Sequence, residues 1–144
     1  MKRIIVALVC LILFFGAPFA RAADSEITGS LFVPIAYLDG HGKIMDANHV
    51  VIGRIDKNGT VYDVANQHLG FVASDLTVRD VHRHVLAVIG SDGTMTDGAG
   101  AVVGTISDVK VTDGAGRSVA RWEGSIDKRA VLAYVFFFSD ALGR

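Results

Sequence analysis

Cysteine is almost absent from this chain, and its position bears on the compartment. The one cysteine, Cys10, lies in a segment that begins with Met1-Lys2-Arg3, continues as an apolar run over residues 4–19, and ends in Ala20-Arg21-Ala22. A basic start, a short apolar core and a small-x-small ending are typical of a secretory signal peptide. We therefore predict that residues 1–22 are a signal peptide and that the protein is periplasmic or secreted. The alternative is an uncleaved anchor, for which the apolar run is short.

The predicted mature chain, residues 23–144, also lacks an excess of positive charge and long apolar runs. Without cysteine it has neither disulfides nor a thiolate metal site. Loss of Lys2, Arg3 and Arg21 leaves 11 of the 14 basic residues against 15 acidic ones, a net charge of −4 with neutral histidines. This balance argues against nucleic acid as a partner. The most apolar remaining stretch, residues 130–138, is nine residues long, so we expect no stable membrane span after cleavage.

What the mature chain does contain is a repeat. An apolar residue, any residue and then aspartate recur five times, and the aspartates are 17, 17, 17 and 16 residues apart: Asp46, Asp63, Asp80, Asp97 and Asp113. Seven residues after each aspartate the residue is always small: Gly53, Gly70, Ala87, Gly104 and Ala120. Such regularity indicates a repeat protein. The repeats cover about residues 39–55, 56–72, 73–89, 90–106 and 107–123.

Each repeat has the pattern of a β-hairpin. Alternation with a period of two on both sides of a polar loop indicates two short antiparallel strands, with the apolar residue and the aspartate on the inward face. Links such as Asp56-Lys57-Asn58-Gly59 have tight-turn chemistry, so each hairpin leads directly into the next. One hairpin cannot bury a face alone, so the hairpins must stack or close into a ring. The recurring small residues indicate close approach of neighbouring groups, as near an axis.

Two flanking segments complete a single all-β domain, residues 23–144. Residues 27–38, which include Pro34, suit an edge strand that leads into the repeats. Residues 130–138, AVLAYVFFF, are predicted as a buried C-terminal closing strand, although periodicity alone leaves a short buried helix open. An end as apolar as this is a poor cap for an open solenoid, which favours a closed ring.

Short G-x-h-x-D hairpins in five copies, behind a signal peptide and ahead of a Phe-rich segment, resemble the five-fold β-flower proteins of bacteria. The resemblance covers about residues 38–138. It implies a compact ring of hairpins around a pseudo-five-fold axis, and it implies no established activity. The chain departs from the pattern at Leu76, where repeat three lacks its first glycine, and at Trp122, a usually aliphatic position. We expect the ring to be least regular there.

Two sets of side chains could bind a metal ion. In a closed ring the repeat aspartates form a circle near one rim, and Asp46, Asp63 and Asp80 could supply carboxylates. Capping of their own loops is the favoured explanation for these aspartates. Four histidines follow the aspartates of repeats one to three on the same rim: His49, His68, His82 and His84. Imidazoles beside carboxylates suit zinc or copper, but the spacing matches no zinc signature, which favours solvated loop histidines.

The sequence contains no nucleophile elbow, phosphate loop or dinucleotide-binding motif, so we predict that the protein is not an enzyme. Tyr62 and Arg79 lie on the outward faces of their strands, beside each other if neighbouring repeats pair, and are the surface candidates for binding. We predict an exported, non-enzymatic binding or structural module without a cofactor, whose partner is a protein or a cell-envelope component. The alternative is a periplasmic transition-metal-binding protein that uses the rim of histidines.

Overall fold

The computed structural model describes residues 24–142, so the predicted signal peptide, residues 1–22, lies outside the described part. The strands are β1 (Ser25–Thr28), β2 (Pro34–Leu38), β3 (Lys43–Asp46), β4 (Val51–Ile55), β5 (Thr60–Asp63), β6 (His68–Val72), β7 (Val78–Asp80), β8 (Val85–Ile89), β9 (Thr94–Thr96), β10 (Val102–Ile106), β11 (Lys110–Asp113) and β12 (Ser118–Arg121). The helix α2 (Lys128–Ala133) follows and continues as a π-helical turn, η1 (Tyr134–Phe138).

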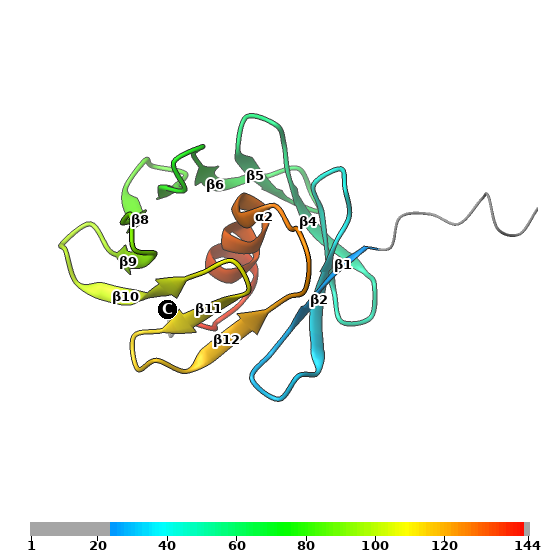
Figure 1. Cartoon of the computed structure of the whole chain (residues 1–144). Coiled ribbons are helices and arrows are strands. Elements are labelled where there is room, and N and C mark those ends of the chain that lie inside the picture. Colours follow the sequence, from blue (N-terminus) through cyan, green and yellow to red (C-terminus); the bar gives the residue numbers. More distant parts are fainter. Residues whose placement is uncertain (1–23, 143–144) are drawn as a thin grey trace, which may run out of the picture.

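The twelve strands form a closed antiparallel barrel in which each strand pairs with the next and β12 pairs with β1 (Figure 1). The pairing register shifts within β1–β2, β3–β4, β5–β6, β7–β8, β9–β10 and β11–β12. Such bulges bend a strand and increase its twist, which helps short strands close into a barrel. The predicted all-β, closed architecture is confirmed.

The N-terminal part of the barrel differs from the prediction. Residues 27–38 were expected to form one edge strand, but they lie in two strands, β1 and β2, joined by a loop over residues 29–33. Neither strand is an edge, because closure of the barrel pairs β1 with both β2 and β12. Since twelve strands surround the axis, the five predicted hairpins do not account for the whole ring, and a five-fold axis is not confirmed.

The interior is lined by the apolar residue of each aspartate motif. These side chains are fully buried: Ile44, Val61, Val78, Met95 and Val111. Two of the small residues on the second strands make room for aromatic rings. A Cβ atom at Gly53 would lie 2.1 Å from Cζ of Phe138, and one at Gly70 would lie 2.3 Å from Cζ of Phe137. The predicted inward face is therefore confirmed, and the close neighbour is the C-terminal segment.

That C-terminal segment is helical, so the predicted closing strand over residues 130–138 is wrong. Figure 1 shows α2, in orange, inside the ring of strands, and residues 130–133 are all buried. A strand needs a partner edge for its backbone groups, but the barrel has already closed through β1 and β12. Inside the barrel only a helix satisfies the backbone N–H and C=O groups within the segment itself.

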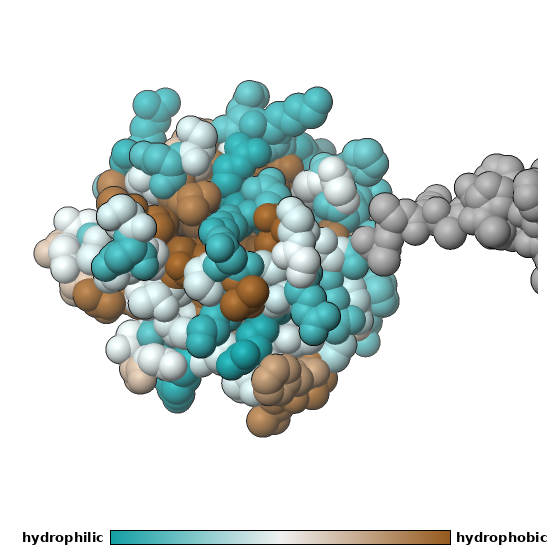
Figure 2. Space-filling model, in the orientation of Figure 1, coloured by the Kyte–Doolittle hydropathy of each residue, from teal (hydrophilic) through white to brown (hydrophobic). Residues whose placement is uncertain are grey.

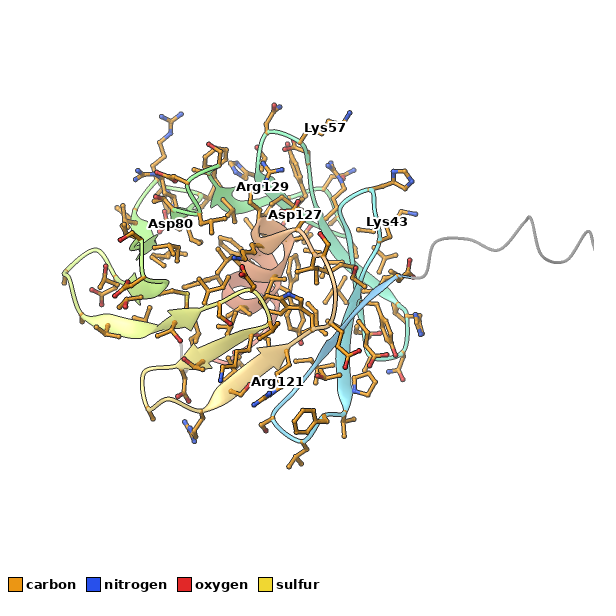
Figure 3. The ribbon with its side chains drawn as sticks, viewed as in Figure 1. Lys43, Lys57, Asp80, Arg121, Asp127 and Arg129 are labelled. Atoms are coloured by element: carbon orange, nitrogen blue, oxygen red, sulfur yellow. The ribbon has the colours of Figure 1, made fainter. Side chains whose placement is uncertain are left out.

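Polar contacts at one mouth of the barrel hold the beginning of α2. The side chain of Asp127 caps the helix by accepting from the backbone N–H of Arg129 at 2.9 Å. Nη1 of Arg129 donates to the backbone oxygen of Lys57 in the β4–β5 connection at 3.3 Å (Figure 3). Nζ of Lys128 lies 2.6 Å from Oδ1 of Asp108. Over residues 24–142, no helix has the length and apolar character needed to span a bilayer.

Candidate binding face on β5, β6 and β7

The five repeat aspartates cap their own loops. Oδ1 of Asp46 accepts from the backbone N–H groups of Asn48 at 2.8 Å and Val50 at 3.0 Å. The other four accept from the equivalent N–H groups, two and four residues later: Asp63, Asp80, Asp97 and Asp113. This is the Asx-type turn that short polar side chains favour. The capping interpretation is confirmed.

The β1–β2 loop has the same backbone geometry without an aspartate. The N–H of Gly29 donates to the oxygen of Val33 at 2.9 Å, and the N–H of Phe32 donates to the oxygen of Gly29 at 3.1 Å. Asp46 makes the equivalent pair with Val50 and His49. Phe32 and His49 both have positive φ, 59° and 61°. In a barrel whose strands run alternately up and down, every second connection lies at the same end. The β1–β2 loop and the five loops that follow the repeat aspartates therefore share one rim.

The structure does not bring the four predicted histidines together as a metal site. The His49 ring stacks on Tyr37 with centroids 3.8 Å apart, and Nε2 of His68 lies 2.9 Å from the backbone oxygen of Gly70. The rings of His82 and His84 are tilted at 45° to each other, with centroids 6.0 Å apart. Within the described residues, no three His, Cys, Asp or Glu side chains are grouped to hold a metal ion. Metal binding stays a prediction without a geometric site.

Tyr62 and Arg79 are not cross-strand neighbours, contrary to the prediction. Tyr62 on β5 pairs with Arg54 on β4 and with His68 on β6. Arg79 on β7 pairs with Phe71 on β6. Tyr62 and Arg79 lie on the first strands of repeats two and three, β5 and β7. These two strands do not pair, because β6, the second strand of repeat two, lies between them. Both side chains nevertheless belong to the same outer part of the barrel.

A cleft of about 620 Å³ lies on that outer face. Its lining comes from β5, β6, β7 and the loop that follows β7: Thr60, His68, Phe71, Arg79, Asp80, Val81 and Arg83. Figure 3 labels Asp80 where β7 ends and this loop begins. A cleft of this size accommodates a small ligand or part of an extended one.

Among the described residues, neither arginine of the cleft forms a direct ion pair. Ion pairs elsewhere in the described part of the chain use Arg117, Lys128 and Arg129, but none involves Arg79 or Arg83. The one carboxylate in the cleft, Asp80, is engaged by its own loop: Oδ2 lies 3.1 Å from Nδ1 of His84. The positive charge of Arg79 helps to lower the pKa of Asp75, but no direct ion pair holds either guanidinium group, so both can bind an anion.

Hydrogen bonds keep Asp80 ionised. Desolvation acts to raise the pKa of this carboxyl, but the backbone N–H of His84, the His84 imidazole and the backbone N–H of His82 lower the pKa overall. The Asp80 charge is thus held by donors within the loop after β7. It is directed toward His84 and not toward the arginines.

Arg54 and Tyr62 extend this surface beyond the cleft. The guanidinium carbon of Arg54 lies 4.0 Å from the centroid of the Tyr62 ring, and the rings of Tyr62 and His68 are 5.9 Å apart. We define the cationic face as these side chains with those of the cleft: Arg54, Tyr62, His68, Phe71, Arg79 and Arg83. Guanidinium groups bind carboxylate and phosphate oxygens bidentately, and the aromatic rings offer flat apolar contact.

Sequence reasoning identified Tyr62 and Arg79 but missed Arg54, Phe71 and Arg83. The repeat pattern did contain a signal for Arg54 and Phe71. The residue that follows the small position on each second strand points outward, and it is Arg54 in repeat one and Phe71 in repeat two. Pairing in the barrel then places Phe71 between Thr60 and Arg79.

Comparison with known proteins gives no relative for this chain: no protein-family model, no curated protein and no solved structure matches it.

Proposed function

We propose that this protein is an exported, non-enzymatic binding module whose cationic face takes an anionic saccharide of the cell envelope. The N-terminal sequence, with its signal-peptide features, supports export. The observation that carries the proposal is the cleft of about 620 Å³, in which two arginines that form no direct ion pair lie beside Phe71. Such a cationic cluster is notable in a chain whose mature part is net negative, because it is not the result of general basicity.

The chemistry of the face suits an acidic sugar chain. Arg79 and Arg83 can each pair with a carboxylate or sulfate group. The Phe71 ring can contact the apolar face of a sugar, and the Thr60 hydroxyl and the His68 imidazole can bond its hydroxyl groups. The cation–aromatic pair of Arg54 and Tyr62 continues the surface onto β4 and β5. The spread over four strands fits an extended anion better than a compact one.

We also infer that the barrel is a ring of hairpin repeats. The recurrence of a register shift inside each hairpin supports this inference, as does the shared loop geometry at Gly29 and at the repeat aspartates. We propose that this chain resembles the five-fold β-flower proteins in its hairpin unit and not in the number of units. In this chain the ring would contain six such units.

Calorimetric titration of the purified protein with oligogalacturonate tests the proposed function. We expect saturable binding of this acidic oligosaccharide, no binding of a neutral cello-oligosaccharide of equal length, and weaker binding as salt is raised. The variant Arg79→Gln/Arg83→Gln should weaken binding by about tenfold or more, since each charged hydrogen bond contributes about 1.5–3 kcal/mol. Loss of Phe71 in Phe71→Ala should weaken it without changing its salt dependence.

The matched control is Lys43→Gln/Lys110→Gln, which removes the same charge from β3 and β11, outside the cleft lining. It should leave the affinity within about twofold, apart from a small long-range effect. Equal weakening by both double variants would show that only net charge matters. Absence of oligogalacturonate binding at low salt would overturn the proposed function.

A further inference from the structure

The barrel closes at one short junction. β1 and β12 pair only through Thr28 and Arg121, whereas β1 pairs with β2 at four positions. Beyond Thr28, the side of β1 that faces β12 has no paired strand at residues 25–27 within the described chain. Glu26 in this stretch is exposed, whereas Ile27 is fully buried, so an added extended segment could reach β1 at its first two residues.

A pocket of about 520 Å³ lies on the outer surface at this junction. Its lining combines β1, the β1–β2 loop, β12 and the residues after it: Glu26, Thr28, Phe32, Val109, Arg121, Trp122 and Glu123. The guanidinium carbon of Arg121 lies 4.8 Å from the centroid of the Phe32 ring. Figure 3 labels Arg121 on β12. Figure 2 shows brown, hydrophobic atoms at the lower edge, where the β1–β2 loop with its exposed Leu31, Phe32 and Val33 lies.

Two N–H donors at this pocket have no acceptor. Trp122 is only 4% exposed, and its indole Nε1 is buried without a hydrogen-bond partner. Nε of Arg121 is likewise buried and unpartnered. Buried donors are nearly always satisfied in native proteins, so each exception needs an explanation. A ligand that supplies acceptors to the pocket is one such explanation.

Both glutamates of the chain line the same pocket. Acidic residues are otherwise aspartates, 13 of 15 in the sequence, and the repeat aspartates cap loops. Glu26 and Glu123 are exposed, and within residues 24–142 neither forms an ion pair. The pocket therefore combines two exposed carboxylates with two buried N–H donors that have no acceptor. This combination suits a ligand that has carbonyl groups and a positive charge.

We propose that the pocket at the β1–β12 junction binds an extended peptide that carries a lysine or arginine. A carbonyl oxygen of the peptide accepts from the Trp122 indole N–H, and the basic side chain pairs with Glu26 and Glu123. The peptide backbone pairs with the open side of β1, as in other complexes formed by strand addition. This ligand differs in sign from that of the cationic face. The two proposals therefore stand or fall separately.

The sole tryptophan of the chain makes this proposal directly testable. The probe is the blocked tetrapeptide acetyl-Lys-Val-Lys-Val-amide, added to the purified ¹⁵N-labelled protein. We expect the one indole N–H signal in the NMR spectrum to move downfield, because the N–H gains an acceptor. The shift should reach a plateau as the peptide concentration rises. Amide exchange at residues 25 and 26 should slow at the same time. An indole signal that does not move in millimolar peptide would overturn the proposal.

Three controls separate the proposal from weaker explanations. The acidic peptide acetyl-Glu-Val-Glu-Val-amide should not bind, and Glu123→Gln should weaken the basic peptide by about tenfold, whereas Asp140→Asn, which removes another exposed carboxylate, should not. Trp122→Phe keeps a ring but removes the donor, and calorimetry should show weaker binding of the same peptide. If spermidine binds as tightly and slows no amide of β1, the site recognises charge alone and the strand-addition proposal is wrong.

Discussion

Single side chains that hold backbone loops make the barrel sensitive to acid. Asp113 is almost buried and accepts from the backbone N–H groups of Arg117 and Ala115 at 2.9 and 3.0 Å. Its second oxygen lies 2.8 Å from Nη2 of Arg117. The hydrogen bond from the backbone N–H of Arg117 is the main cause that lowers the pKa of Asp113. The pKa values of other carboxyls are lowered too: Asp75, Asp80, Asp92 and Asp108.

The sign of the pH effect follows from these lowered values. The unfolded chain binds protons near the ordinary carboxyl pKa of 3.8, while the folded chain resists protonation until the pH is lower. The contribution to stability is therefore fully present above that pKa and is lost as the pH falls through the folded values. Thermal melts should give a Tm that changes little from about pH 7 to pH 5 and then decreases toward pH 2.5. Asp113→Asn should reduce this decrease, and a Tm independent of pH below 5 would contradict the linkage.

The fourth residue of each hairpin loop has a left-handed backbone conformation, which favours glycine although Phe32 and His49 also adopt it. Gly100 has φ of +84°, and a Cβ there would meet no atom within 4 Å. Gly100→Ala should therefore lower the free energy of unfolding by about 1–2 kcal/mol, the cost of the left-handed conformation for an L-residue. Gly40 is equally open and lacks a positive φ. Gly40→Ala should leave stability unchanged or raise it by up to about 1 kcal/mol, and denaturant titration of both variants makes the comparison.

At the scale of elements, a motif based on aspartate could not find the first hairpin. Gly29 lies 17 residues before Asp46 and takes the aspartate's place. The rest of the pattern is present, with Ile27 two residues earlier and Ala36 seven residues later, both fully buried. A search based on the apolar and small positions would have detected this repeat. Its loop folds like the others because the backbone bonds, and not the carboxylate, define the turn.

The C-terminal segment could not be assigned from its composition. AVLAYVFFF has no clear period, since every side chain on a segment inside a barrel meets apolar neighbours. Its helical conformation follows from the closure of β1 on β12, which is a long-range fact. The residues of the cationic face could likewise be predicted only in part from the sequence. The repeat showed that Tyr62 and Arg79 point outward, but the placement of Phe71 between their strands depends on the pairing order.

The helical segment supplies much of the core. Truncation of one of its side chains measures how much that segment contributes to stability. Leu132 is fully buried inside the barrel, so Leu132→Ala should lower the free energy of unfolding by about 2–5 kcal/mol. Val64, which is 68% exposed, provides the control. Val64→Ala should change stability by no more than about 0.5 kcal/mol. If Leu132→Ala were as mild as Val64→Ala, α2 would not fill the barrel.

At the scale of the whole molecule, the closed order of strands separates two chemically opposite surfaces. β6, at the centre of the cationic face, lies six strands from β12 in either direction around the ring. The pocket with both glutamates is therefore on the far side of the barrel from Arg79 and Arg83. Because the lumen between them is filled by α2 and η1, both surfaces are external and rest on one rigid core.

The position of the helix inside the barrel also determines an order of assembly. Contacts that complete the ring join distant parts of the chain: Thr28 bonds Arg121 across 93 positions, and Tyr134 bonds Ile35 across 99. Contacts this far apart in sequence make folding slow. Moreover, the segment that the strands surround follows all of them in the described chain. A barrel that closed before α2 and η1 entered it would therefore enclose an unfilled lumen.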